Sequence, residues 1–140
     1  MLKNDDLISF SYFMLLIKID IKSEETDDSN TVIASLLSIE VIFGEEQRRK
    51  ITFDSRKKQR IRIGRIKNEE TDFAFEDDDV SRKQCMIIFE DNNWFIVDGD
   101  GEKPSSNGTW FYPEKYFNIS DGLIIRMGTT IFECKVFEDK

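Results

Sequence analysis

Histidine is absent from this chain of 140 residues. Because histidine is the commonest general base and the commonest metal ligand in proteins, its absence rules out a serine–histidine or cysteine–histidine catalytic pair. The one hint of a metal site is residues 98–102 (DGDGE), but Lys103 stands where a calcium-binding helix–loop–helix motif requires glycine, and no helical pattern flanks the loop. The sequence therefore predicts no enzyme, no metal site and no cofactor.

Cysteine is scarce, and its two copies, Cys85 and Cys134, both lie in apolar runs. That placement favours two buried free thiols in a reducing compartment over a disulfide. We therefore expect an intracellular protein, and both the nucleus and the cytoplasm remain open.

No apolar run is long enough to cross a membrane. The most apolar stretch, FSYFMLLI at residues 10–17, is far shorter than the roughly 20 residues that a membrane helix needs. Asp5 and Asp6 precede it, where a secretory signal would be basic, and no small-residue cleavage site follows. The sequence predicts a soluble protein with no membrane partner.

The net charge of −8 argues against a nucleic-acid partner, which would require lysine and arginine against phosphates. The charge is nevertheless banded. Residues 45–67 hold ten basic and three acidic residues, a net of +7, whereas residues 68–80 hold seven acidic residues and no basic one. Two solvated segments of opposite sign explain these bands, and so does a role in choosing a peptide ligand.

Short strands separated by turns every 8–12 residues give the chain an all-β rhythm, with no helical period of ten or more residues and no internal repeat. This predicts a two-sheet sandwich of about eleven mostly antiparallel strands. We expect strands near residues 36–43, 49–53, 59–64, 72–75, 85–90, 93–98, 109–112, 116–119, 123–127 and 130–137. The core candidates are Ile61, Ile63, Phe73, Phe75, Ile87, Phe89, Trp94, Ile96, Leu123, Ile125, Phe132 and Val136.

Residues 1–35 are expected to be an N-terminal extension of a sandwich that spans residues 36–138. Residues 17–22 alternate apolar and polar side chains, which predicts one extra strand, and residues 23–30 (SEETDDSN) predict an acidic loop. The stretch at residues 10–17 does not alternate, so we expect it to be buried on both faces or covered by another chain.

Three polar clusters each follow a short apolar run: Gly64-Arg65, residues 81–84 (SRKQ) and residues 105–108 (SSNG). Taken singly, each is an ordinary strand end or turn. Taken together, they offer a guanidinium fork, hydroxyl donors and amide donors, which are the groups that bind phosphate. Loops at one end of a rigid sandwich are a common place for binding residues.

The same segments, IGR, VSRKQ and SSNGTW in this order with a WFIVD strand between the last two, resemble a forkhead-associated (FHA) domain. Gly64 lies 17 positions before Ser81, and Ser81 lies 26 positions before Asn107. The resemblance covers about residues 36–137. It implies an eleven-stranded sandwich that binds a phosphothreonine-containing protein or peptide at its loop end, and therefore a signalling module for protein–protein interaction.

By motif position, the resemblance implies that Arg65 and the Ser81 hydroxyl contact the phosphate and that Arg82 adds a further contact. Ser106 would help line the pocket for the threonine methyl group, and Asn107 would bond the peptide backbone.

The resemblance gives the remaining motif residues a structural role. Gly64 and Gly108 would shape the loops. Gln84 stands where the family usually has a histidine that braces the loops, so we expect a looser brace there. Residues 77–79 (DDD) lie in the loop that helps choose the ligand's third residue after the phosphothreonine, which favours a basic residue at that position.

One alternative keeps the fold and drops the ligand. The chain would then be a structural subunit of a larger assembly, with the sandwich and the apolar N-terminal strand as docking surfaces and phosphate binding weak or lost.

Overall fold

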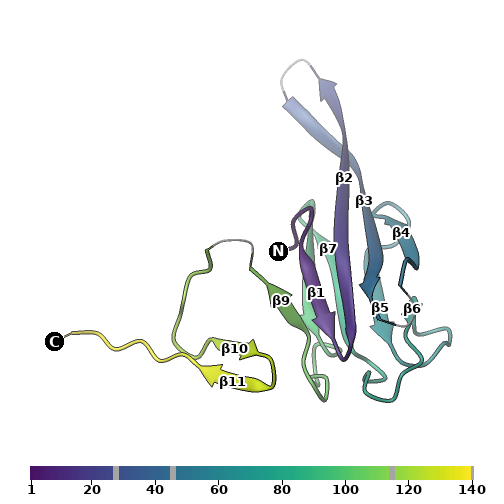
Figure 1. Cartoon of the computed structure of the whole chain (residues 1–140). Coiled ribbons are helices and arrows are strands. Elements are labelled where there is room, and N and C mark those ends of the chain that lie inside the picture. Colours follow the sequence, from purple (N-terminus) through teal and green to yellow (C-terminus); the bar gives the residue numbers. More distant parts are fainter. Residues whose placement is uncertain (27–28, 45–46, 114–115, 140) are drawn as a thin grey trace.

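A computed structural model of the chain describes residues 1–26, 29–44, 47–113 and 116–139, with side chains left undescribed for residues 25, 26 and 29–33. These ranges contain eleven strands and no helix (Figure 1). The strands are β1 (Leu7–Phe10), β2 (Phe13–Thr26), β3 (Ser29–Phe43), β4 (Lys50–Asp54), β5 (Arg60–Gly64), β6 (Phe73–Ala74), β7 (Cys85–Glu90), β8 (Asn93–Asp98), β9 (Trp110–Tyr112), β10 (Ile124–Met127) and β11 (Thr130–Glu133).

The strands form three sheets. One has five strands in the order β4-β3-β2-β1-β9, a second has four in the order β6-β5-β7-β8, and β10 pairs only with β11. All pairings are antiparallel except the short parallel pair of β5 and β6. The predicted all-β, mostly antiparallel sandwich is therefore confirmed.

The core lies between the five-stranded and four-stranded sheets, and alternation along the strands builds it. In β5, Ile61 and Ile63 are buried while Arg60 and Arg62 are exposed, as the two-residue period of a strand requires. Leu37, Ile39 and Val41 form the matching stripe of β3, also fully buried. A continuous apolar core thus joins the two sheets.

Four phenylalanines pack together at one end of this core. The ring of Phe75 lies 5.2 Å from that of Phe10, 4.7 Å from that of Phe13 and 4.8 Å from that of Phe73, measured between centroids. Phe10 and Phe13 belong to the first hairpin of the chain, and Phe73 and Phe75 lie at and beyond β6. This cluster fixes the start of the loop that continues to Ser81.

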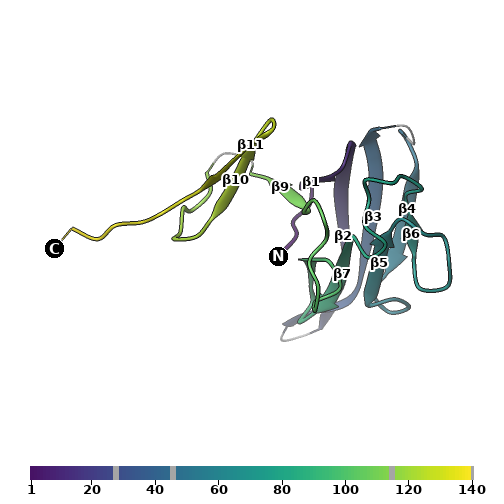
Figure 2. The same ribbon diagram turned by 90° about the horizontal axis from the view of Figure 1, so that it is seen from below.

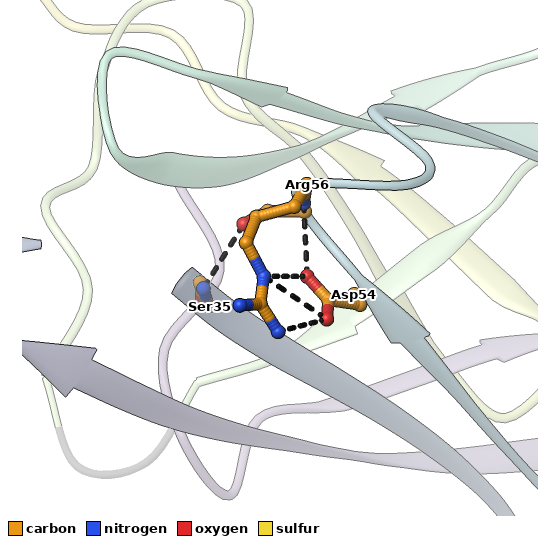
Figure 3. Close-up of polar contacts among 4 residues, drawn as sticks. Ser35, Asp54 and Arg56 are labelled. Carbon is orange, nitrogen blue, oxygen red and sulfur yellow. Dashed lines mark hydrogen bonds and ion pairs between the residues drawn. The ribbon is translucent and has the colours of Figure 1, made fainter. Parts of the chain in front are cut away.

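A buried polar contact also ties the sheets together. The indole nitrogen of Trp94 in β8 donates to the Ser35 hydroxyl of β3 over 2.9 Å, and the Ser35 backbone amide donates to the Ser55 hydroxyl over 3.0 Å. Figure 3 shows Ser35 beside Asp54 and Arg56, which form an ion pair of 2.6 Å. Hydrogen bonds from the Arg56 side chain and backbone amide lower the pKa of Asp54 to about 2.

The N-terminal residues are more deeply integrated than expected. In place of one extra strand, residues 1–35 contain β1, β2 and the first part of β3, and both β2 and β3 extend into the segment predicted as a loop at residues 23–30. Residues 27 and 28 of that segment lie outside the described residues. Phe10, Phe13, Leu15 and Ile17 are buried in the shared core. The division of the chain at residues 35 and 36 stays a prediction.

The C-terminal hairpin, in contrast, is less buried than expected. Both views show β10 and β11 set apart from the two larger sheets (Figures 1 and 2). Phe132 is 44% exposed and Val136 52% exposed, and Leu123 and Ile125 are only partly buried, so these four core predictions were wrong. The strand expected at residues 116–119 does not form, and β11 ends at Glu133. The other eight core candidates lie in or against the core.

Within the described ranges, no helix is long and apolar enough to cross a membrane. Cys85 and Cys134 are both free thiols, as predicted, although only Cys85 is fully buried.

The two cysteines should differ sharply in reactivity. Burial, with the nearby Asp98 charge as the second cause, raises the pKa of the Cys85 thiol to about 12, so it carries almost no reactive thiolate at mildly alkaline pH. Cys134 is only partly buried. We expect iodoacetamide to label Cys134 in the folded protein and to label Cys85 only after unfolding in urea, as measured by peptide mass spectrometry. Equal labelling of the two thiols in the folded protein would contradict this packing.

Candidate functional site

A hollow of about 650 Å³ opens at one end of the sandwich, where three loops meet. The loop after β5 contributes Arg65, the loop between β6 and β7 contributes residues 78–83, and the loop between β8 and β9 contributes Ser106 and Asn107. All five residues predicted from motif position to bind a phosphopeptide line this hollow. The structure thus brings together segments that are far apart in the sequence.

The first two loops touch closely at Gly64. A β-carbon at Gly64 would lie 2.0 Å from the backbone oxygen of Arg82, a distance that no side chain tolerates. The backbone amide of the next residue, Arg65, donates a hydrogen bond to the backbone oxygen of Ser81 over 3.1 Å. Its guanidinium donates to the Asp78 backbone oxygen over 3.3 Å. Gly64 therefore permits the approach that places Arg65 beside the serine loop.

The serine loop is in turn tied to the third loop. The Ser106 backbone amide donates a hydrogen bond to the Ser81 hydroxyl over 2.9 Å. The Asn107 side-chain amide donates one to the backbone oxygen of Asp79 over 3.2 Å. Gly108 follows with a left-handed backbone (φ of 83°), a conformation that glycine adopts readily. Ser81 and Asn107 are consequently held close together in the lining of one hollow.

Gln84 lies beneath these loops, fully buried, and joins them. Its side-chain oxygen accepts from the Ser81 amide over 3.0 Å. Its side-chain nitrogen donates to the Gly108 oxygen over 3.0 Å and to the Thr109 hydroxyl over 3.1 Å. The side chain therefore uses both ends of its carboxamide to hold the second and third loops, which is the bracing position expected for it.

A second buried network was not predicted. Asp98, the last residue of β8, accepts from the Ser105 hydroxyl over 2.6 Å, from the Ser105 amide over 3.0 Å and from the Thr109 hydroxyl over 2.8 Å. The Ser105 hydroxyl also accepts from the Gly108 amide over 3.0 Å. The signal in the sequence was an acidic residue at the end of a core strand, followed by a Ser-Ser-Asn-Gly-Thr turn.

The charges around the hollow are more balanced than the sequence suggested. Four cations line it, and so do four acidic residues: Arg65, Arg82, Lys83 and Lys103, with Asp78, Asp79, Asp100 and Glu102. Lys83 pairs with Asp100 over 3.2 Å. Backbone hydrogen bonds from Lys103 and Glu102, followed by the Lys83 side chain, lower the pKa of Asp100 to about 2, so this carboxylate is charged at neutral pH.

The hollow therefore has no excess of positive charge, and Arg65, Arg82 and the Ser81 hydroxyl are potential hydrogen-bond donors in its lining. Among the described residues, no group of three or more acidic or cysteine side chains is arranged to hold a metal ion.

The Gln84 brace predicts a specific loss of stability. Substituting Gln84→Met keeps the volume of the side chain but leaves the buried Ser81 amide and Gly108 oxygen without these partners. We expect the free energy of unfolding to fall by about 2–4 kcal/mol in urea titrations, since each unsatisfied buried polar group costs about 1–3 kcal/mol. The matched control is Gln59→Met, at an exposed glutamine, which should stay within about 0.5 kcal/mol of the wild type. Equal effects of the two substitutions would refute the bracing role.

Comparison with known proteins agrees with this geometry. The FHA domain family model matches residues 61–128, a range that runs from β5 to the turn between β10 and β11 and contains all three loops of the hollow. No curated protein and no solved structure matches the chain.

FHA domains are phosphopeptide-binding modules of protein–protein interaction and not enzymes, so the match supports a phosphorylated protein partner in general terms. The resemblance seen in the motifs is thereby confirmed: residues 61–128 of the chain match the FHA domain family.

Proposed function

We propose that the hollow binds a phosphothreonine-containing peptide and that the protein functions by binding partner proteins that carry such a segment. The observation that carries the proposal is the convergence of Arg65, Ser81 and Asn107 on one hollow that Gln84 holds together from beneath. Because the donors are fixed before the ligand arrives, little conformational entropy is lost when it binds.

The unused hydrogen-bonding groups support a phosphate ligand. The Ser81 hydroxyl accepts a bond from the Ser106 amide, and its own proton remains available for a phosphate oxygen. Arg65 has five guanidinium protons, and the contact with Asp78 uses one of them. Arg82 lines the same hollow and can add a second guanidinium.

The neighbouring residues support recognition of a peptide rather than of a free anion. The Asn107 side-chain nitrogen is bonded to Asp79, which leaves its side-chain oxygen free to accept a backbone amide from an extended ligand. Ser106 lines the hollow near Ser81, and its exposed side chain offers a small surface to a threonine methyl group.

The alternative of a structural subunit loses its main support. Phe10, Phe13, Leu15 and Ile17 of the apolar stretch pack in the protein's own core, and β1 is paired on both edges, by β2 and by β9. β1 therefore offers no free edge to another protein.

We place the function inside the cell, in the nucleus or the cytoplasm. The two free thiols support a reducing compartment.

The phosphate contact predicts a large effect of one arginine. A matched pair of peptides, one with phosphothreonine and one with threonine, should be titrated against the protein by calorimetry. We expect the phosphorylated peptide to bind much more tightly, and Arg65→Ala to weaken it by about 10- to 100-fold because a charge-assisted hydrogen bond contributes about 1.5–3 kcal/mol.

The matched control is Lys57→Ala, which removes an exposed cation from a turn outside the hollow. This substitution should leave both affinities unchanged. If phosphorylated and unphosphorylated peptides bind equally, the proposal fails.

The acidic side of the hollow predicts the ligand's sequence. Asp78 and Asp79 line it, and Asp77 precedes them. In an oriented library of phosphothreonine peptides, we expect lysine or arginine to be selected at the third position after the phosphothreonine. Replacing Asp78 and Asp79 with asparagine should remove this preference without abolishing phosphate dependence. Selection of aspartate at that position would contradict this assignment.

A further inference from the structure

Among the described cations of the basic band at residues 45–67, some side chains have a hydrogen-bond or ion-pair partner and others have none. The Arg49 side chain donates to the Ala74 oxygen and lies over the Phe73 ring, Arg56 pairs with Asp54, and Lys58 pairs with Asp72. Arg60 and Arg62 differ, because no hydrogen bond or ion pair of their guanidinium groups is found within the described part of the chain. Both project from β5, one of the inner strands of the four-stranded sheet.

These two arginines line a second hollow of about 660 Å³. Its floor is the outer face of β5 and β7, with Arg62 opposite Met86 in the strand register. The loop after β5 forms one wall through Asn68, Glu70 and Thr71, and the loop after β8 forms the other. We call this hollow the outer trough.

The outer trough adjoins the phosphate hollow. Arg82, Lys83, Asp100 and Glu102 line both, so the two hollows are separated only by a shared ridge of side chains. An extended peptide advances about 3.3 Å per residue, so a ligand anchored at Ser81 reaches across such a ridge within a few residues. One peptide can therefore occupy both hollows.

The charge of the outer trough favours an anion at its floor. Lys83 and Asp100 neutralise each other across the wall, which leaves three guanidinium groups, those of Arg60, Arg62 and Arg82, against the carboxylates of Glu70 and Glu102. The Arg60 and Arg62 backbones are held in a paired strand, whereas both carboxylates are exposed on turns of the rim. Guanidinium groups two residues apart on one strand face suit an oxyanion with several acceptor oxygens.

We propose that the outer trough binds a second phosphate group, carried by the same peptide that places its phosphothreonine in the first hollow. The inference rests on the proposed function for the peptide and extends it, since it makes the protein a reader of doubly phosphorylated segments. Arg60 and Arg62 hold the second phosphate, and Arg82 on the ridge contributes to both.

The test compares peptides with one phosphothreonine against peptides that carry a second phosphothreonine at each neighbouring position in turn. Calorimetry measures affinity for the wild type and for the double variant Arg60→Gln/Arg62→Gln, which keeps long side chains on the sheet face. We expect the second phosphate to tighten binding by about tenfold at one or two positions, the factor typical of one charge-assisted contact. The double variant should lose this gain and keep its affinity for the singly phosphorylated peptide.

The matched control is Lys50→Gln/Lys57→Gln, which removes the same charge from the same basic band outside both hollows. It should retain the gain. An equal loss in the two double variants would show a long-range charge effect and overturn the inference. If no second phosphate tightens binding while the singly phosphorylated peptide still binds through Arg65, the inference fails and the proposed function stands.

Inorganic phosphate provides an arm that does not depend on any peptide. In a nuclear magnetic resonance titration, added phosphate should shift the amide signals of Arg62 and Met86 in both the wild type and Arg65→Ala. These shifts should vanish in Arg60→Gln/Arg62→Gln. Should the proposed function fail, this titration still decides whether the outer trough binds phosphate, and unshifted trough signals would overturn the inference.

Discussion

The carboxamide of Gln84 is the contact on which the site depends. It reaches the Ser81 amide at one end and the Gly108 oxygen and Thr109 hydroxyl at the other, in a place closed to water. A buried carboxamide without partners would be costly, so the two loops are held in the one arrangement that satisfies it. We expected a looser brace at this position, and the three contacts found make Gln84 a continuous link between the loops.

The rest of the loop end follows from that link. With the loops of Ser81 and Asn107 bonded to each other, Arg65 completes the hollow because Gly64 lets its strand approach the Arg82 backbone. The acidic residues around the rim cancel much of the positive charge. Under the proposed function, selectivity for phosphate comes from the direction of a few hydrogen bonds, whereas general attraction would be weak in a chain with a net charge of −8.

Sequence reasoning succeeded where local chemistry decides the structure. The motifs around Gly64, Ser81 and Asn107 predicted loops that do meet, and the alternation of β5 predicted its buried face. It failed where burial depends on distant partners. Residues 10–17 show no alternation in sequence, yet four of them belong to the core, and Phe132 alternates well yet remains exposed on a separate hairpin. No local pattern tells an apolar strand which sheet it will join. The Asp98 network was missed for the same reason, since its partners are set by the fold.

The most direct measurement of the central claim is a crystal structure of the protein with a phosphothreonine peptide bound. The account predicts the phosphate within hydrogen-bond distance of the Arg65 guanidinium and the Ser81 hydroxyl, with the contacts of Gln84 to Ser81 and Gly108 intact. A phosphate bound elsewhere on the protein, or bound in the hollow while the two loops have separated from Gln84, would contradict it.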